Sequence, residues 1–382
     1  MFLYKILEYP LFYQISFFLF WLISLIAYSY YLDYKNIDKT VAFRLKLLFL
    51  FLSFISFIRL YFNFLPFTPD SIYYLDEYYR LDFFGPGSYE RFISFINLLF
   101  GHNVNILIII NILIYCLSIK ELVLLVPNYK NKNFTIFFIF AFFLPSVIWF
   151  VPNILRESLF IYFIIMVLKF SLKNIKKTDF IFTDLLKFIF FSFSAFVLRP
   201  QILPILFIWS TFIFSKRNKF FIIPFLALGY IINQLDYVKS QIITKLSFHY
   251  LESFKTEATD SLISNIAFDK LLIPTTFYEL IIYSPELFFR FLFVPYVWDL
   301  GNLKYTFAYI DALFVTILIF LIIYNVLKNR IFNYDIIYFS FLFLFILSIF
   351  EIAFTGAVRH RFPFIITLLP LIVSKKNNSK IK

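Results

Sequence analysis

The sequence predicts an all-α polytopic membrane protein, and its composition and hydrophobic pattern support this. Of its 382 residues, 62% are hydrophobic and 24% aromatic, whereas only 15% are charged. An average soluble domain carries about 25% charged residues. Long apolar runs recur along the chain between short polar breaks, as expected of membrane-spanning helices. With 61 Phe and 27 Tyr the chain would collapse in water, which excludes a disordered or nucleic-acid-binding protein despite the formal charge of +12.

The apolar runs predict about 11 transmembrane helices, with 10 to 12 as the range that the breaks allow. They cover residues 11–31, 47–65, 104–119, 134–151, 158–172, 180–198, 202–214, 220–235, 307–327, 336–354 and 362–373. The first run ends without a small-residue cleavage site and is expected to be a retained anchor helix. The runs 202–214 and 362–373 are short, so a tilted broken helix and a re-entrant segment both fit them.

A single transmembrane domain over residues 1–382 is expected, with two large loops on one side of the membrane. The first loop covers 66–103. The second covers 236–304 and contains an apolar stretch, 280–298, that two prolines and two charges interrupt. This stretch is expected to be interfacial or re-entrant rather than a full crossing.

The basic residues predict the orientation of the chain. With the N-terminus outside and the C-terminus in the cytoplasm, 21 of the 35 Lys and Arg fall in inner loops, and most acidic residues fall outside. The two basic types divide differently, because 18 of 24 Lys lie inside whereas 8 of 11 Arg lie outside. Insertion does not require outer arginines, and guanidinium groups suit bidentate phosphate binding. We therefore expect an anionic ligand at the outer face, although single arginines can also snorkel to headgroups or pair with carboxylates.

The first outer loop carries the densest group of polar and aromatic residues. Its candidate catalytic carboxylates are Asp70, Asp76 and Glu77; Tyr73, Tyr74 and Glu90 are candidate substrate-binding residues. A carboxylate there can act as general base on a sugar hydroxyl or hold a divalent cation, Mg²⁺ or Mn²⁺, that bridges a phosphate. Tyrosines can stack on sugar faces. A solvated loop whose tyrosines belong to the interfacial aromatic belt is the competing interpretation.

Three further groups of charged residues fall at predicted outer helix ends. Arg156 and Glu157 follow Pro152 at the start of a span, where free helix amides also favour an anion. Arg199 stands between Leu198 and Pro200 at the end of another span. The third group is the Arg359-His360-Arg361 triplet, which is followed by the last apolar run. Two guanidinium groups at that depth form the strongest candidate phosphate site.

Other chemistry finds no sequence support. The chain has no P-loop, GxSxG, HExxH or dinucleotide-binding motif. Its one cysteine, Cys116, cannot form an intramolecular disulfide. No residue is named as a metal ligand and no cofactor is assigned, apart from the open role of a divalent cation beside Asp70.

The three motif groups together resemble bacterial polytopic glycosyltransferases. The residues that carry the resemblance are Asp70 with Tyr73 and Tyr74, Leu144-Pro145-Ser146 with Arg156-Glu157, and Arg359-His360-Arg361-Phe362-Pro363. Those enzymes have a GT-C type helical bundle and use polyprenyl-phosphate-linked sugars, and the repeat-unit polymerases of capsule, exopolysaccharide and O-antigen are the most similar. The resemblance implies that Asp70 is the base or metal-binding residue, and that Arg156, Arg199, Arg359 and Arg361 bind pyrophosphate.

This resemblance implies a multi-pass protein of the bacterial inner membrane that polymerises polyprenyl-pyrophosphate-linked repeat units of a surface polysaccharide. Its partners would be the lipid-linked sugar donor, a lipid-linked or glycan acceptor and membrane lipid, without nucleic acid. Two alternatives stay open. One is a transferase that adds a single sugar from a polyprenyl-monophosphate donor, and the other is a flippase or transporter of lipid-linked oligosaccharide, which should show charged or broken helices near the bilayer midplane.

Overall fold

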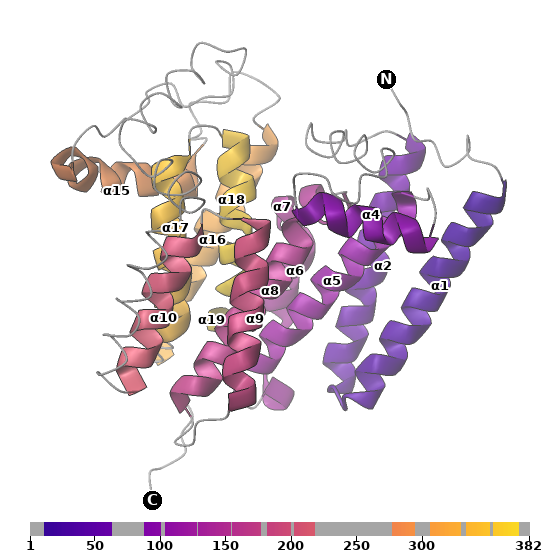
Figure 1. Cartoon of the computed structure of the whole chain (residues 1–382), viewed down its shortest axis with the longest axis horizontal. Coiled ribbons are helices and arrows are strands. Elements are labelled where there is room, and N and C mark those ends of the chain that lie inside the picture. The colour runs from indigo at the N-terminus through magenta and orange to yellow at the C-terminus, as the bar shows by residue number, and fades with distance from the viewer. Residues whose placement is uncertain are drawn as a thin grey trace, which may run out of the picture. The chain divides into compact units, whose positions relative to one another are not determined.

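The computed structural model describes residues 11–62, 88–100, 104–127, 129–153, 155–176, 182–199, 202–217, 277–294, 306–329, 334–351 and 354–373. Within these ranges the regular elements are helices, and none of these residues forms a strand (Figure 1). The predicted all-α class is therefore confirmed for the described part of the chain.

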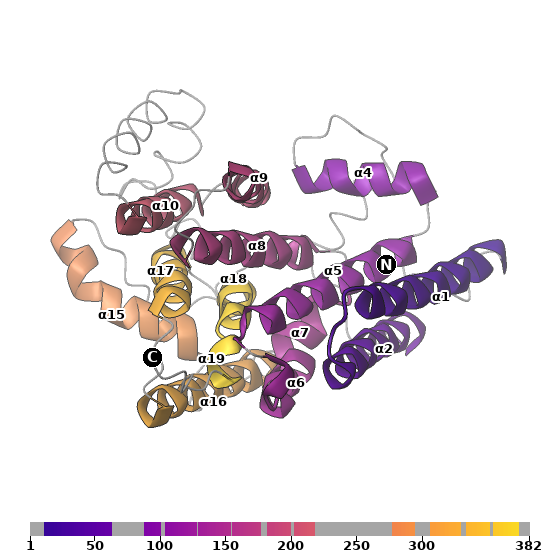
Figure 2. The same cartoon turned by 90° about the horizontal axis from the view of Figure 1, so that it is seen from below.

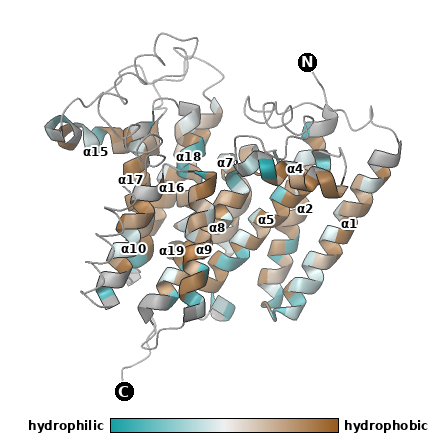
Figure 3. Ribbon diagram, viewed as in Figure 1, coloured by the Kyte–Doolittle hydropathy of each residue, from teal (hydrophilic) through white to brown (hydrophobic). Residues whose placement is uncertain are grey.

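Five helical segments in this part are long and apolar enough to cross a membrane. They are Ile15–Tyr34, Lys39–Arg59, Asn105–Leu125, Thr306–Lys328 and Gly356–Val373. Figure 3 colours the central turns of α9 and α17 as hydrophobic as well. These helices support a membrane-embedded protein, while the count of 11 spans stays a prediction, since residues 220–235 lie outside the described ranges.

The chain divides into two compact units, residues 1–165 and 166–382, with the boundary inside α8 (Glu157–Lys176). In the first unit, α1 (Leu11–Tyr34), α2 (Lys39–Phe62) and α5 (Val104–Leu125) pack on one another. Helix α6 (Thr135–Phe143) packs on α2, and α4 (Ser88–Phe100) packs on α5. A short helix, η2 (Tyr129–Asn131), follows α5.

Local sequence explains the sharp turn between α1 and α2. Asn36 has a φ of 49°, a left-handed conformation that Asn adopts more readily than most residues. Asp38 then caps α2, because its Oδ1 accepts hydrogen bonds from the backbone N–H groups of Thr40 at 3.0 Å and Val41 at 3.2 Å. At the same end of this unit, Lys120 donates to the Tyr31 hydroxyl at 2.5 Å.

The predicted span 134–151 is not one continuous helix. It breaks at Leu144, whose ψ of 123° is extended, and α7 (Pro145–Phe150) begins at the next residue. The cause is Pro145, which disfavours the helical conformation in the residue before it and is well placed at the first position of a new helix.

In the second unit, α15 (Phe277–Phe293) packs on α16 (Thr306–Asn329), α17 (Tyr334–Phe350) and α18 (Phe354–Thr367). Helix α10 (Leu203–Arg217) packs on α17, where the fully buried Trp209 ring lies 4.9 Å from that of Phe339. Helix α9 (Phe182–Leu198) lies beside α8, and α19 (Pro370–Val373) continues from α18 and contacts α16.

One helix in each unit lies across its neighbours. Figures 1 and 2 show α4 crossing the direction of α5, and α15 crossing that of α17. Helix α4 buries Ile93 and leaves the equally apolar Leu98 70% exposed. Helix α15 covers most of the stretch 280–298 and is continuous through Pro285. Whether that stretch is interfacial or re-entrant stays a prediction.

The last helix begins earlier than its apolar run. The sequence places the Arg359-His360-Arg361 triplet before a helix at 362–373, but α18 already starts at Phe354 and carries the triplet in its second turn. The expectation rested on hydropathy, which penalises three polar residues in a row. Helix continues here because side chains on neighbouring elements compensate these charges, as the site geometry shows.

Candidate functional site

The predicted loop residues cannot be placed. Asp70, Tyr73, Tyr74, Asp76 and Glu77 lie outside the described residues. Glu90 is in α4, but its side chain also lies outside the description. Their roles therefore stay predictions, and the site is built from the charged residues of the helices.

A histidine and a glutamate form the centre of the candidate site in the second unit. His360 Nδ1 and Glu351 Oε2 share a hydrogen bond of 2.6 Å. Glu351 follows the last residue of α17, and His360 lies in the second turn of α18. The Glu351 side chain is 6% exposed, whereas that of His360 is 38% exposed. A short polar pair with one open side is thus held where two apolar helices meet.

Gly356 makes room for this pair. The Glu351 carboxylate lies directly against the Gly356 Cα, so that a Cβ at this position would collide with Glu351 Oε1 and would come within 2.8 Å of its Cδ. Any other residue would push the Glu351 side chain away from its present position. The close approach accounts for a glycine inside an otherwise ordinary helical turn.

Two arginines lie around the histidine. Arg199 and Arg359 are both close enough to act electrostatically on the His360 ring. Arg199 is 4% exposed. Its backbone N–H donates to Ala195 O at 3.0 Å at the C-terminal end of α9. Arg359 is half-buried and precedes His360 in α18. Two of the predicted substrate-binding residues, Arg199 and Arg359, therefore lie within electrostatic reach of a third, His360, and Glu351 joins them.

This cluster of Arg199, Glu351, Arg359 and His360 combines two chemical capacities. The two guanidinium groups carry fixed positive charge and suit phosphate oxygens. The imidazole hydrogen-bonded to a carboxylate is an arrangement that orients the ring and can accept a proton from a hydroxyl at its free nitrogen. The cluster can thus bind an anion and take up a proton within one small region.

Arg361 does not join this cluster. Its side chain is fully buried and donates to Phe291 O at 2.9 Å, Leu292 O at 2.7 Å and Asp311 Oδ2 at 2.9 Å. The first two acceptors are carbonyls at the C-terminal end of α15, where the helix dipole favours a cation. We interpret Arg361 as the residue that ties α15, α16 and α18 together, and its predicted phosphate contact stays untested.

The first unit contains a comparable arginine. Arg59 in α2 is 1% exposed and donates to Pro152 O at 2.7 Å and to Trp149 O at 3.2 Å. The Trp149 carbonyl is in the last turn of α7, and the Pro152 carbonyl follows that helix. Carbonyls at a helix C-terminus generally need partners from outside the helix. Arg59 therefore fixes the chain just before the predicted pair Arg156 and Glu157.

An asparagine holds the other side of the same segment. The fully buried Asn111 in α5 donates from Nδ2 to Asn153 O at 2.7 Å and Leu155 O at 3.3 Å, and it contacts the Tyr89 hydroxyl at 3.4 Å. Arg156 follows this segment and is half-buried. Glu157 is fully buried at the start of α8, where the helix dipole stabilises a carboxylate.

Sequence reasoning missed four of these residues. Glu351 and Asp311 are single acidic residues at the edge or inside an apolar run, which is a detectable signal, because an acidic residue in a membrane helix needs a partner. Asn111 carries the same kind of signal. Arg59 lies at the end of the predicted span 47–65, and no local pattern distinguishes it from an arginine that snorkels.

The described residues contain no group of three or more His, Cys, Asp or Glu side chains suited to a metal ion. The predicted divalent cation involves Asp70, which lies outside them. Comparison with protein-family models, curated proteins and solved structures finds no match to this chain.

Proposed function

We propose that this chain is a membrane glycosyltransferase that polymerises polyprenyl-pyrophosphate-linked repeat units of a surface polysaccharide. The observation that carries the proposal is the His360–Glu351 hydrogen bond at the end of apolar helices, within electrostatic reach of Arg199 and Arg359. A lipid-linked pyrophosphate presents its anionic group at this depth while its chain stays in the membrane. The resemblance to bacterial polytopic glycosyltransferases supports the same class.

The reaction assigns one task to each part of the cluster. A hydroxyl oxygen of the acceptor attacks the anomeric carbon of the donor, forming a new C–O bond. The bond between that carbon and the pyrophosphate oxygen breaks, and its electron pair leaves with the polyprenyl pyrophosphate. Arg199 and Arg359 stabilise the developing negative charge. The hydroxyl proton passes to the free nitrogen of His360, which Glu351 orients.

The location follows from the distribution of basic residues. Lys173 and Lys216 lie near the ends of α8 and α10 opposite to the end of α9 that carries Arg199. By the positive-inside rule this lysine-rich end faces the cytoplasm, which leaves the cluster at the outer face of the bacterial inner membrane.

The deciding experiment compares polysaccharide chain lengths in cells. A deletion strain is complemented with wild type, His360→Gln, Glu351→Gln or the control Lys216→Gln, which removes a lysine at the opposite end of α10 that pairs with Asp335. We expect single repeat units from the deletion strain and from both site variants at normal protein level. Long polymer in the wild type and in the control completes the expected result.

Other outcomes would redirect the proposal. Long chains of altered composition in the deletion strain would identify the single-sugar transferase. The transporter has one observation in its favour, the fully buried Arg361–Asp311 pair inside apolar helices. Elongation of lipid-linked repeats by purified protein in detergent, where no sidedness exists, would exclude a transporter. Unchanged polymer in the deletion strain would refute all three functions.

A further inference from the structure

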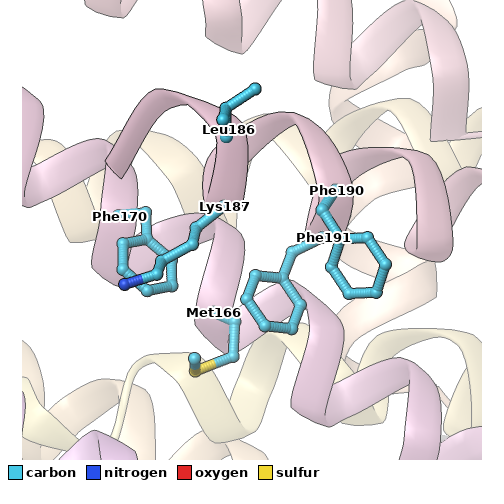
Figure 4. Close-up of a pocket in the computed structure, with 6 residues that line it drawn as sticks. All are labelled: Met166, Phe170, Leu186, Lys187, Phe190 and Phe191. Carbon is cyan, nitrogen blue, oxygen red and sulfur yellow. The ribbon is translucent and has the colours of Figure 1, made fainter. Parts of the chain in front are cut away.

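A groove lies on the second unit between α8 and α9, away from the candidate site. Its volume is about 480 Å³, and it is lined by Met166, Phe170, Leu186, Lys187, Phe190 and Phe191 (Figure 4). This volume is within the range of about 300–1,000 Å³ that holds ligands in proteins. The lining is apolar except for Lys187. Such a lining suits a ligand that has a hydrocarbon chain and a negatively charged end.

The apolar wall is built by helical spacing. Met166 and Phe170 are four residues apart in α8, and Leu186 and Phe190 are four apart in α9, so each pair shares one face of its helix. The rings of Phe170 and Phe191 stack with centroids 5.7 Å apart and join the two helices. On α9, the Phe190 side chain is 60% exposed, so this wall opens to the surroundings of the helices.

Positive charge gathers at one end of the groove. The ammonium groups of Lys169, Lys173 and Lys187 lie 5.9, 5.6 and 5.7 Å from the centroid of the Phe170 ring. Figure 4 shows the Lys187 side chain running beside that ring. Asp184 Oδ1 lies 3.5 Å from Lys173 Nζ and forms an ion pair with it. Three ammonium groups around one ring therefore concentrate positive charge at this end of the groove.

The positions of the lysines and of the aromatic wall along α8 and α9 match the headgroup and the acyl chain of a phospholipid. Lys173 is one turn from the C-terminal end of α8, and Lys187 is within the second turn of α9, so their amines reach the polar boundary of the helices. Met166, Phe190 and Phe191 lie further from these helix ends. A lipid phosphate at the lysines would therefore place its acyl chain along the aromatic wall.

We propose that this groove binds an anionic diacyl phospholipid, with the phosphate held by Lys169, Lys173 and Lys187 and one acyl chain lying against Phe170 and Phe190. Basic pockets between transmembrane helices bind such headgroups through charge attraction. The proposal concerns a lipid of the bilayer and does not depend on the enzymatic function proposed above. It assigns the groove to a lipid that holds α8 and α9 in place.

Native mass spectrometry of the full-length protein in detergent tests this assignment. The probes are dioleoyl phosphatidylglycerol and dioleoyl phosphatidylcholine at equal concentration. We expect the wild type to prefer phosphatidylglycerol. The double variant Lys169→Gln/Lys187→Gln should bind it about thirtyfold more weakly, from roughly fivefold per lysine near the headgroup. Lys187→Arg should retain the affinity because it keeps the charge.

A matched control comes from the same unit. Lys328 ends α16 and lies 5.2 Å from the Tyr324 ring centroid, so it also combines a terminal lysine with an aromatic ring, but it does not line the groove. Lys328→Gln should leave phosphatidylglycerol binding unchanged. Equal binding by the double variant and this control would overturn the proposal, as would a wild type without preference for the anionic lipid.

Two competing probes test whether the groove binds a phospholipid, a phosphate without a chain or a polyprenyl phosphate. Glycerol 1-phosphate carries the headgroup without a chain, and its displacement of phosphatidylglycerol at equal concentration would overturn the role of the aromatic wall. Undecaprenyl phosphate represents a substrate-type lipid. If it displaces phosphatidylglycerol completely at equal concentration, the groove is a polyprenyl site and the proposal fails, whereas retention of phosphatidylglycerol supports the assignment.

Discussion

His360 and Arg361 are adjacent in α18 but belong to two different environments. Arg361 and Asp311 form a closed ion pair, with side chains 0% and 1% exposed and three hydrogen bonds on the guanidinium group. His360 and Glu351 form a pair that remains 38% exposed on the histidine side. Successive residues of a helix point about 100° apart, so one turn serves both environments.

The comparison teaches that charge in a membrane helix does not by itself indicate function. Both pairs join a basic residue of α18 to an acidic residue outside that helix, and both satisfy the need of a charge for a partner. The closed pair uses its hydrogen bonds on backbone carbonyls and a carboxylate, which stabilises packing. The open pair keeps the His360 ring partly exposed and within electrostatic reach of Arg199 and Arg359. Exposure and the identity of the partners distinguish them.

The largest effect is expected from breaking the closed pair. Asp311→Ala leaves the Arg361 charge buried and should lower the free energy of unfolding by about 3–5 kcal/mol. Denaturant titration in detergent micelles, followed by tryptophan fluorescence, measures this loss. The double variant Asp311→Leu/Arg361→Met should regain most of it, since no charge remains buried. A stable Asp311→Ala protein would show that the pair does not hold α16 to α18.

A smaller loss of folding free energy is expected in the first unit, where the buried Arg59 donates to two backbone carbonyls. Arg59→Met removes the hydrogen bonds to Trp149 O and Pro152 O and should cost about 2 kcal/mol, measured by the same titration. Arg44→Met on the same helix is the control. Arg44 donates to the Thr135 hydroxyl at 3.1 Å in an exposed position, and its loss should stay within about 0.5 kcal/mol. Equal losses for the two variants would contradict a special role for Arg59.

Activity rather than stability should respond when Gly356 is changed. In Gly356→Ala the new Cβ displaces the Glu351 carboxylate, so we expect shortened polysaccharide chains from a protein that still folds. The helical preference for Ala over Gly, about 1 kcal/mol, offsets the displacement in the free energy of unfolding. In a Glu351→Ala background, where no carboxylate meets the new Cβ, the same substitution should raise the free energy of unfolding by about 1 kcal/mol. No gain there would show that Gly356 is required by another neighbour.

The smallest stability change is expected at the open pair. Glu351→Gln keeps a hydrogen-bonding group beside His360 and should change the free energy of unfolding by about 1 kcal/mol or less. Asp311→Asn is the matched substitution at the closed pair, and it should cost more because Arg361 keeps a fixed, fully buried charge. The two variants measured side by side give the sharpest form of the comparison. Equal losses would remove the distinction between the two environments.

Hydropathy predicted which parts of the chain become helices, and it did so because a bilayer requires every backbone polar group to be paired within the segment. Hydropathy did not predict where helices break or begin beside proline and charged residues. The break at Leu144 was readable from Pro145, whereas the early start of α18 was not, since hydropathy treats Arg359, His360 and Arg361 as three equal penalties. Their cost depends on neighbours that are distant in the sequence.

The sequence by itself determined an all-α membrane protein, with arginines and lysines unevenly divided and a charged triplet near its end. Only the tertiary structure decided the separate roles of that triplet. Asp311 is 50 residues from Arg361, and Arg199 is far from His360 in the chain, so no local pattern relates them. The physical reason is that desolvation and pairing, which set what a charge does, depend on which helices pack together.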